Sequence, residues 1–147
     1  MEYLEEPAPG CFFCAALGSA DERAHLVVTR EADAIIMLNK YPYGHGHLLI
    51  APHRHVPRPA DLTDDEYQAL ARALLRAGTV LERAFGPEGM NIGMNLGRAA
   101  GAGVTDHCHW HVLPRWSGDT NFMPLLAETK VMSEHLHATL DRLRACL

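Results

Sequence analysis

The amino-acid sequence predicts an α+β fold built on a five-stranded, mostly antiparallel sheet. Two observations predict it: short apolar runs of strand length follow one another across turns, and one long helical pattern interrupts them. Strands that come in groups, with few helices between them, favour antiparallel pairing over a parallel sheet. The length of 147 residues suits one domain, so we expect 1–147 to fold as a single domain after a loose N-terminal lead-in, 1–10.

Five segments are expected to form the strands. Residues 25–30 and 34–39 predict short strands on either side of a charged turn, and residues 47–52 form a third apolar run that Pro52 closes. Residues 89–97 predict the fourth strand. A loop of small residues, 98–106, then leads into the fifth strand at 107–114.

One long helix and a C-terminal helix complete the predicted fold. Thr63 and Glu66 fit a capping box, in which each side chain satisfies a free amide of the first helical turn. Gly86 and Pro87 end this helix. Apolar residues recur at helical spacing between these ends: Tyr67, Leu70, Ala71, Leu74, Ala77, Gly78 and Leu81. Ser133 is expected to cap the last helix, whose apolar stripe is Leu136, Leu140, Leu143 and Leu147.

Composition narrows the classes of partner. The formal net charge of −5 argues against a protein that binds nucleic acid through its overall charge, although a local pocket can still hold a small phosphorylated ligand. No apolar stretch approaches the roughly 20 residues of a membrane span, and the acidic N-terminus does not resemble a signal peptide. We therefore expect a cytoplasmic protein without a membrane partner, whose four cysteines are reduced or metal-bound.

Three alternating histidines form the most informative segment. His107, His109 and His111 lie two residues apart in a run that predicts a strand, so they project from one face, about 7 Å apart in succession. Imidazoles accept protons, bind metals and attack phosphorus. The alternatives are a solvated face of an edge strand and a pure metal site, although the linear spacing suits one metal ligand better than three.

A stretch of small residues precedes the histidines. From Asn95 to Gly103 the chain is rich in Gly and Ala, which lets backbone amides approach an anion. Such turns are also common in hairpins, so the position beside the histidines is what makes this stretch a candidate phosphate seat. The sequence contains no GxxxxGK[ST] motif, which excludes a P-loop match.

The segment 107–113, HCHWHVL, resembles the signature of the histidine-triad (HIT) family. The resemblance runs from Cys11 to Trp116, and residues 114–122 are similar to the branch that contains bacterial diadenosine tetraphosphate phosphorylases. It implies the HIT fold, a homodimer in which two five-stranded sheets join, and a nucleotide or dinucleoside polyphosphate substrate. The wide apolar stripe of the long helix supports the dimer indirectly.

The resemblance also implies a mechanism. His109 would attack the α-phosphorus of a nucleotide and form a nucleotidyl-histidine, for which a neutral imidazole is a suitable nucleophile near pH 7. His111 would position the nucleophile and handle charge beside the phosphate, and His47 would support His111. Judged without the resemblance, His47 is an ordinary core or surface histidine.

The nucleotide contacts implied by the resemblance lie in two places. Asn39 would contact the ribose, although from the residues alone it is equally a turn residue before Lys40. Asn95 would open the phosphate loop. Many members have a serine or threonine three residues before the first triad histidine, where this sequence has Val104. Backbone amides would replace the missing hydroxyl, supplied by Gly101, Ala102 and Gly103.

The paired cysteines predict a metal site. Cys11 and Cys14 have the spacing of a zinc knuckle, which on its own also fits a redox pair. The resemblance implies that His55 and His107 complete a structural zinc site, with His53 as a competing ligand. Cys108 and Cys146 are expected to be ordinary thiols.

Four functions remain as candidates. The first is an enzyme that cleaves dinucleoside polyphosphates by phosphorolysis or hydrolysis, which the similarity of residues 115–122 favours. The same site would suit a nucleoside phosphoramidase. A nucleotide-binding protein with little turnover would form no covalent intermediate, and a zinc-stabilised interaction module would not need His109.

Overall fold

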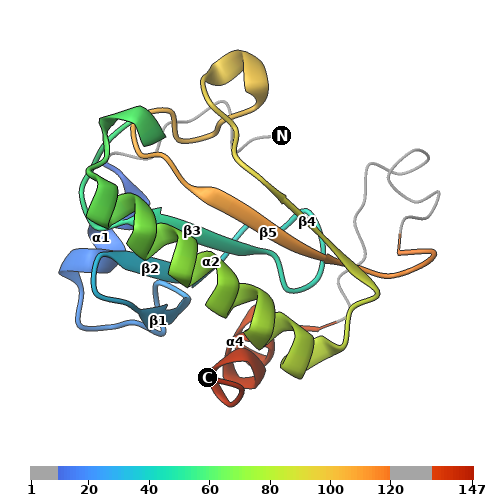
Figure 1. The fold of residues 1–147 in the computed structure, drawn as a ribbon. Coiled ribbons are helices and arrows are strands. Elements are labelled where there is room, and N and C mark those ends of the chain that lie inside the picture. The colour runs from blue at the N-terminus through green and yellow to red at the C-terminus, as the bar shows by residue number, and fades with distance from the viewer. Residues whose placement is uncertain (1–9, 120–133) are drawn as a thin grey trace.

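The computed structural model of the protein describes residues 10–119 and 134–147. Its helices and strands follow the chain as α1 (Phe12–Gly18), β1 (Val27–Arg30), β2 (Ala34–Leu38), β3 (Leu48–Pro52), α2 (Asp64–Phe85), β4 (Gly89–Gly93), β5 (Trp110–Arg115) and α4 (Leu136–Arg144). The five strands form one sheet in the order β1-β2-β3-β5-β4, and every neighbouring pair is antiparallel. The predicted α+β fold is confirmed (Figure 1). No helix in the described ranges is long and apolar enough to cross a membrane.

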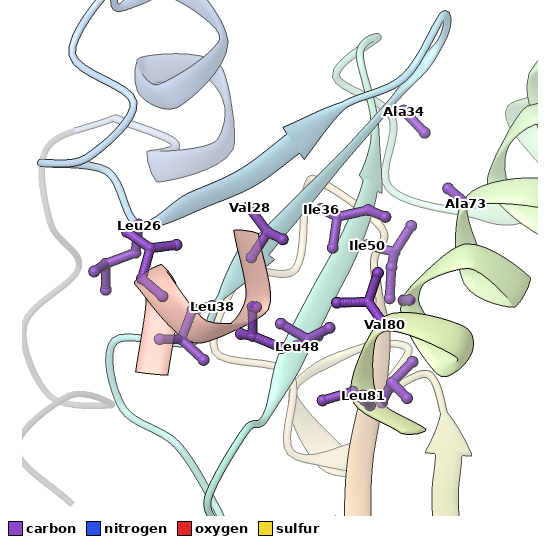
Figure 2. Packing of buried hydrophobic residues seen from close by; sticks show 14 of the residues in the cluster. Leu26, Val28, Ala34, Ile36, Leu38, Leu48, Ile50, Ala73, Val80 and Leu81 are labelled. Carbon is purple, nitrogen blue, oxygen red and sulfur yellow. The ribbon is translucent and has the colours of Figure 1, made fainter. Parts of the chain in front are cut away.

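Alternation along the strands divides the core between the two faces of the sheet. On one face, Ile36, Ile50 and Val112 pack with residues of α2 and α4. Figure 2 shows side chains from the strands and from α2 meeting in this cluster. On the other face, Met37 and Leu49 pack with residues of α1. The strand period of two therefore gives the sheet one face covered by α2 and α4, and one partly covered by α1.

Helix α2 begins and ends where the sequence predicts. Thr63 Oγ1 accepts the Glu66 N–H, Glu66 Oε2 accepts the Thr63 N–H, and Gly86 closes the helix in the left-handed region at φ 54°. The predicted apolar stripe is wrong in part, because the face of the helix that packs on the core is rotated relative to the predicted face. Tyr67 is 48% exposed and Ala71 is exposed. The buried positions are Ala69, Leu70, Ala73, Ala77, Val80 and Leu81.

The strand bounds also differ from the sequence prediction, by one or two residues in β1, β2 and β3 and by more in β4 and β5. Strand β4 ends at Gly93 instead of residue 97, because Gly93 is the last residue paired with β5. Strand β5 begins at Trp110 instead of residue 107, because the Cys108 N–H donates to Val56 O instead of joining the ladder. The seven-residue helix α1 was not expected. The predicted cap of the last helix, Ser133, lies outside the described residues, and α4 has His135 as its N-cap.

Candidate active site and metal centre

The three alternating histidines project from the face of the sheet that also carries α1. His111 lies in β5 opposite Leu49, whose side chain belongs to the cluster on that face. His107 and His109 lie just before β5 and keep the alternation. Successive rings are close: the centroids of His109 and His111 are 4.9 Å apart, and those of His111 and His47 are 5.1 Å apart. The triad and His47 therefore form a row of imidazoles.

Hydrogen bonds in this row fix which ring nitrogen of His47 and His111 carries a proton. The Tyr43 N–H donates to His47 Nδ1 at 3.0 Å, so in the neutral ring the proton lies on Nε2. That Nε2–H then donates to His111 Nδ1 at 2.9 Å. The proton of neutral His111 consequently lies on its Nε2. His47, which is fully buried, thus hydrogen-bonds directly to His111.

His109 is held in the opposite tautomer. Its Nδ1–H donates to the His107 carbonyl at 2.9 Å, which leaves a lone pair on Nε2. The ring is only 6% exposed, and burial lowers its pKa although the hydrogen bond to His107 opposes that shift. Near neutral pH the ring is therefore uncharged, as a nucleophile requires.

Burial also keeps His111 neutral. Desolvation of the ring, with a smaller contribution from neighbouring His109, lowers the pKa of His111 to about 4. At neutral pH this ring is an uncharged donor through Nε2. A donor of this kind can hydrogen-bond to a phosphate oxygen next to the nucleophile without adding a buried charge.

A second cluster lies at the other end of the row. Single ligand atoms from Cys11, Cys14, His55 and His107 all lie within 4.8 Å of one another. In tetrahedral zinc geometry an S···N separation is about 3.5 Å, given the usual Zn–S and Zn–N lengths. The observed separations bracket that value: Cys11 Sγ–His107 Nδ1 is 3.3 Å, Cys14 Sγ–His55 Nδ1 is 3.2 Å and Cys14 Sγ–His107 Nδ1 is 3.7 Å. The donor set can hold a metal ion and fits zinc.

The far side of each histidine ring is also bound. His107 Nε2–H donates to the Pro52 carbonyl at 2.9 Å, and His55 Nε2 lies 3.3 Å from the Asp106 carboxylate. The His107 bond leaves Nδ1 unprotonated and directed at the sulfurs, as a metal-binding histidine requires, and the Asp106 carboxylate lies where it can orient the His55 ring in the same way. The competing ligand, His53, lies outside this cluster, because its Nε2–H donates to Ala34 O at 3.1 Å.

The predicted nucleotide contacts lie in two loops. Asn39 Oδ1 accepts the Tyr41 N–H at 3.0 Å, and its Nδ2 lies 3.3 Å from His47 Nδ1, so this residue shapes the turn and contacts the row of imidazoles. Asn95 is half-buried, with its amide nitrogen beside Gly101. The amides of two predicted anion donors bond inside their own loop: Gly101 N–H to Arg98 O and Ala102 N–H to Gly97 O.

Comparison with known proteins decides the family. The model of the HIT domain family matches residues 20–118, two thirds of the chain. This chain belongs to the HIT domain family. The AP-4-A phosphorylase of Mycobacterium tuberculosis is 41% identical to it over 114 residues, which are 78% of this chain and 58% of that relative. The chain therefore spans less than two thirds of the length of this relative.

Solved structures share the HIT fold. A hypothetical histidine triad nucleotide-binding protein from Sulfolobus tokodaii superposes with a TM-score of 0.73 and 25% identity, over 92% of this chain and 91% of that one. A Zn-bound histidine triad family protein from Mycobacterium smegmatis superposes with a TM-score of 0.72 and 23% identity, over 93% and 92% of the two chains. The second likeness concerns the fold alone.

Three residues of this HIT domain were not singled out from the sequence. Phe13 contacts the rings of both His107 and His109, with centroids 5.0 Å and 4.9 Å away. Tyr43 stacks on His111 at 5.6 Å between centroids. Asp106 contacts His55. Because Phe13 lies inside the Cys-x-x-Cys motif, the sequence places it next to the predicted metal site. No periodic pattern marks Tyr43 or Asp106.

Proposed function

We propose that this HIT domain is a nucleotidyl-transferring enzyme that uses His109 as its nucleophile. One observation carries the proposal: the Nδ1–H of His109 is bound to the His107 carbonyl, so that the Nε2 lone pair of a buried, neutral ring is left for attack. A purely structural histidine would be expected to use both ring nitrogens. The neighbouring row of His111 and His47 adds a neutral donor with a fixed tautomer.

The first chemical step follows from these tautomers. The Nε2 lone pair of His109 attacks the α-phosphorus, the bond from phosphorus to the bridging oxygen breaks, and its electron pair leaves with the departing phosphate. The Nε2–H of His111 donates to an oxygen of the reacting phosphate and offsets the charge that develops there. In the second step an acceptor attacks the same phosphorus and releases His109.

We propose dinucleoside polyphosphates as the substrate class and phosphate as the acceptor. The name of the M. tuberculosis relative and its identity over 78% of this chain support this choice. The loop after β4 supports it as well, because Arg98 gives that loop a positive charge beside small residues. Arg115 forms an ion pair with Asp119 and donates a hydrogen bond to Asn91 Oδ1. These contacts hold the start of the segment that resembles the phosphorylase branch.

Product analysis with labelled phosphate tests this proposal. The protein is incubated with diadenosine tetraphosphate and radiolabelled phosphate, and we expect the label in ADP. AMP and ATP formed at a rate independent of phosphate would instead identify a hydrolase. Cleavage of a nucleoside phosphoramidate with no cleavage of diadenosine tetraphosphate would identify a phosphoramidase. Nucleotide binding without turnover would contradict the enzyme proposal as a whole.

For the metal centre we propose structural zinc bound by Cys11, Cys14, His55 and His107. The four donors fit a closed tetrahedral site that leaves no open position for a substrate. We expect about one zinc per chain in protein never exposed to a chelator. Elemental analysis that finds another metal, or none, in such protein would contradict the proposal.

We also propose a homodimer formed across strand β4. In the described ranges β4 pairs only with β5, so its outer edge is open to another strand. Apolar side chains are exposed near that edge: Ile92 is 51% exposed, and Tyr67 of α2 is 48% exposed. Tyr67 and Gly78 lie three helical turns apart on one side of α2, and Gly78 lies beside Met90 of β4.

Light scattering at micromolar concentration tests the dimer. The unchanged protein should have twice the mass of the chain, and Ile92→Glu should shift it toward the monomer. The matched control is Leu147→Glu, which charges an exposed apolar residue at the C-terminus, away from β4. A monomeric unchanged protein would refute the proposal.

A further inference from the structure

Phe13 belongs to the hydrophobic cluster under α1, and its ring also contacts two of the histidines. It is fully buried in α1, and its ring lies against the nucleophile His109 with a centroid distance of 4.9 Å and an angle of 45° between the planes. The same ring lies 5.0 Å from His107. The side chain therefore contacts both the proposed metal-binding imidazole and the proposed nucleophile.

The proposed reaction creates a charge at this contact. When His109 Nε2 bonds to phosphorus, the electron pair of the broken P–O bond leaves with the departing phosphate. His109 keeps its Nδ1 proton, bound to the His107 carbonyl, so the ring becomes a cation. With 6% of its surface exposed, water can do little to solvate that cation. The surrounding protein has to stabilise it.

Few groups around His109 are able to do so. In the described ranges no carboxylate forms an ion pair or a hydrogen bond with this ring, which contacts the His107 carbonyl and the rings of His111 and Phe13. The face of an aromatic ring attracts a cation within about 6 Å, and more strongly where water is excluded. Phe13 is within that distance.

We propose that Phe13 is a positioning residue whose ring holds the His109 imidazole and stabilises the cation formed on it during nucleotidyl transfer. This inference rests on the proposed role of His109 as nucleophile. It predicts that the electron density of the Phe13 ring, and not only its size, controls the rate of the first chemical step. A leucine of similar volume would fill the space without providing that attraction.

Fluorinated phenylalanines at position 13 separate electron density from size. One, two and three fluorine atoms weaken the attraction of the ring for a cation stepwise while changing its shape little. We measure the rate of nucleotidyl-enzyme formation from diadenosine tetraphosphate by rapid quench. Metal content and Tm are measured on the same preparations. The expected result is a graded loss of rate, about 5- to 30-fold over the series, with metal content and Tm unchanged.

Phe12 supplies the matched control. It lies next to Phe13 in α1 and stacks on it, with centroids 4.1 Å apart, but no contact with His109 is found in the described ranges. The same fluorinated series at Phe12, and Phe12→Leu, should leave the rate within about twofold, whereas Phe13→Leu should slow it as much as the most fluorinated ring. A rate that is flat across the Phe13 series, or that falls only in step with metal loss, overturns the inference. Absence of any nucleotidyl-enzyme in the unchanged protein overturns the proposed function as well.

Discussion

His107 and His109 are buried imidazoles two residues apart, yet they present opposite ring nitrogens. His107 donates Nε2–H to the Pro52 carbonyl and turns Nδ1 toward the sulfurs of Cys11 and Cys14. His109 donates Nδ1–H to the His107 carbonyl, so that its Nε2 keeps the lone pair that the proposed attack needs. The comparison teaches that the chemistry of each histidine is set by the backbone carbonyl within its reach, since residue type and spacing are the same for both.

The two ends of the row should therefore fail in different ways. We expect loss of a group at the His109 end to remove activity and leave the fold, and loss of a group at the His107 end to lower metal content and stability first. Phe13 contacts both rings, so we expect a structural change at the His107 end to reach the His109 end through this side chain. The following variants test this division, from the largest expected effect to the smallest.

His109→Asn should lower turnover of diadenosine tetraphosphate on the order of 10⁴-fold or more, because the group that forms the covalent intermediate is removed. Zinc content and Tm should stay close to those of the unchanged protein. Steady-state kinetics and elemental analysis on one preparation check both halves. A folded variant that keeps nearly full activity would contradict the assignment of the nucleophile.

Cys14→Ser should lower metal content and stability first, in contrast to His109→Asn. Loss of a thiolate ligand should release the metal and lower the free energy of unfolding by about 3 kcal/mol, roughly 10 °C in Tm. Cys146→Ser is the matched control, because Cys146 is partly buried and lies outside the cluster, so both metal content and Tm should change little. Equal metal content in the two variants, measured by elemental analysis, would contradict the predicted ligand set.

The pH dependence of stability tests the neutral state of His111. Its pKa is about 4 in the fold and about 6.5 in an unfolded chain, so the unfolded state binds more protons between these values. The free energy of unfolding should therefore fall as the pH falls from about 6.5 to about 4. Between pH 7 and 4.5 His111 should account for up to about 2 kcal/mol of this fall.

His111→Asn isolates this contribution, because metal release and the titration of the carboxylates and of the other histidines lower the stability of the variant and of the unchanged protein alike. Denaturant midpoints at pH 7 and pH 4.5 should show a smaller fall in the variant than in the unchanged protein. Identical falls would mean that His111 is not the group that titrates in this range.

The smallest effect is expected at Asp106. Its carboxylate fixes the His55 ring through Nε2, so Asp106→Ala should weaken metal affinity about 10-fold, while catalysis with bound metal stays unchanged. The matched control is Asp33→Ala, which removes an exposed carboxylate at the β1–β2 turn. Competition with a chelator gives both affinities. Indistinguishable affinities would remove Asp106 from the metal site and leave the four ligands as they are.

The sequence by itself determined the local features of this protein. The capping box of α2 depends on two residues three positions apart, Thr63 and Glu66, so the pattern predicts it without any tertiary information. Short apolar runs that come in groups likewise predict the antiparallel sheet, and the strand period of two predicts the common face of the three histidines. The spacing of Cys11 and Cys14 indicated a metal site, and the resemblance to HIT proteins supplied His55 and His107.

Only the tertiary structure decided the tautomers of His107 and His111. The tautomer of His107 depends on the carbonyl of Pro52, 55 residues away, and that of His111 depends on His47, 64 residues away. The late start of β5 at Trp110 likewise depends on a bond from Cys108 to Val56. Helix α1 is only seven residues long, too short to be stable without packing, so burial of Phe13 against the histidines has to hold it in place. Contacts between distant parts of the chain set these features, and no local pattern of residues encodes them.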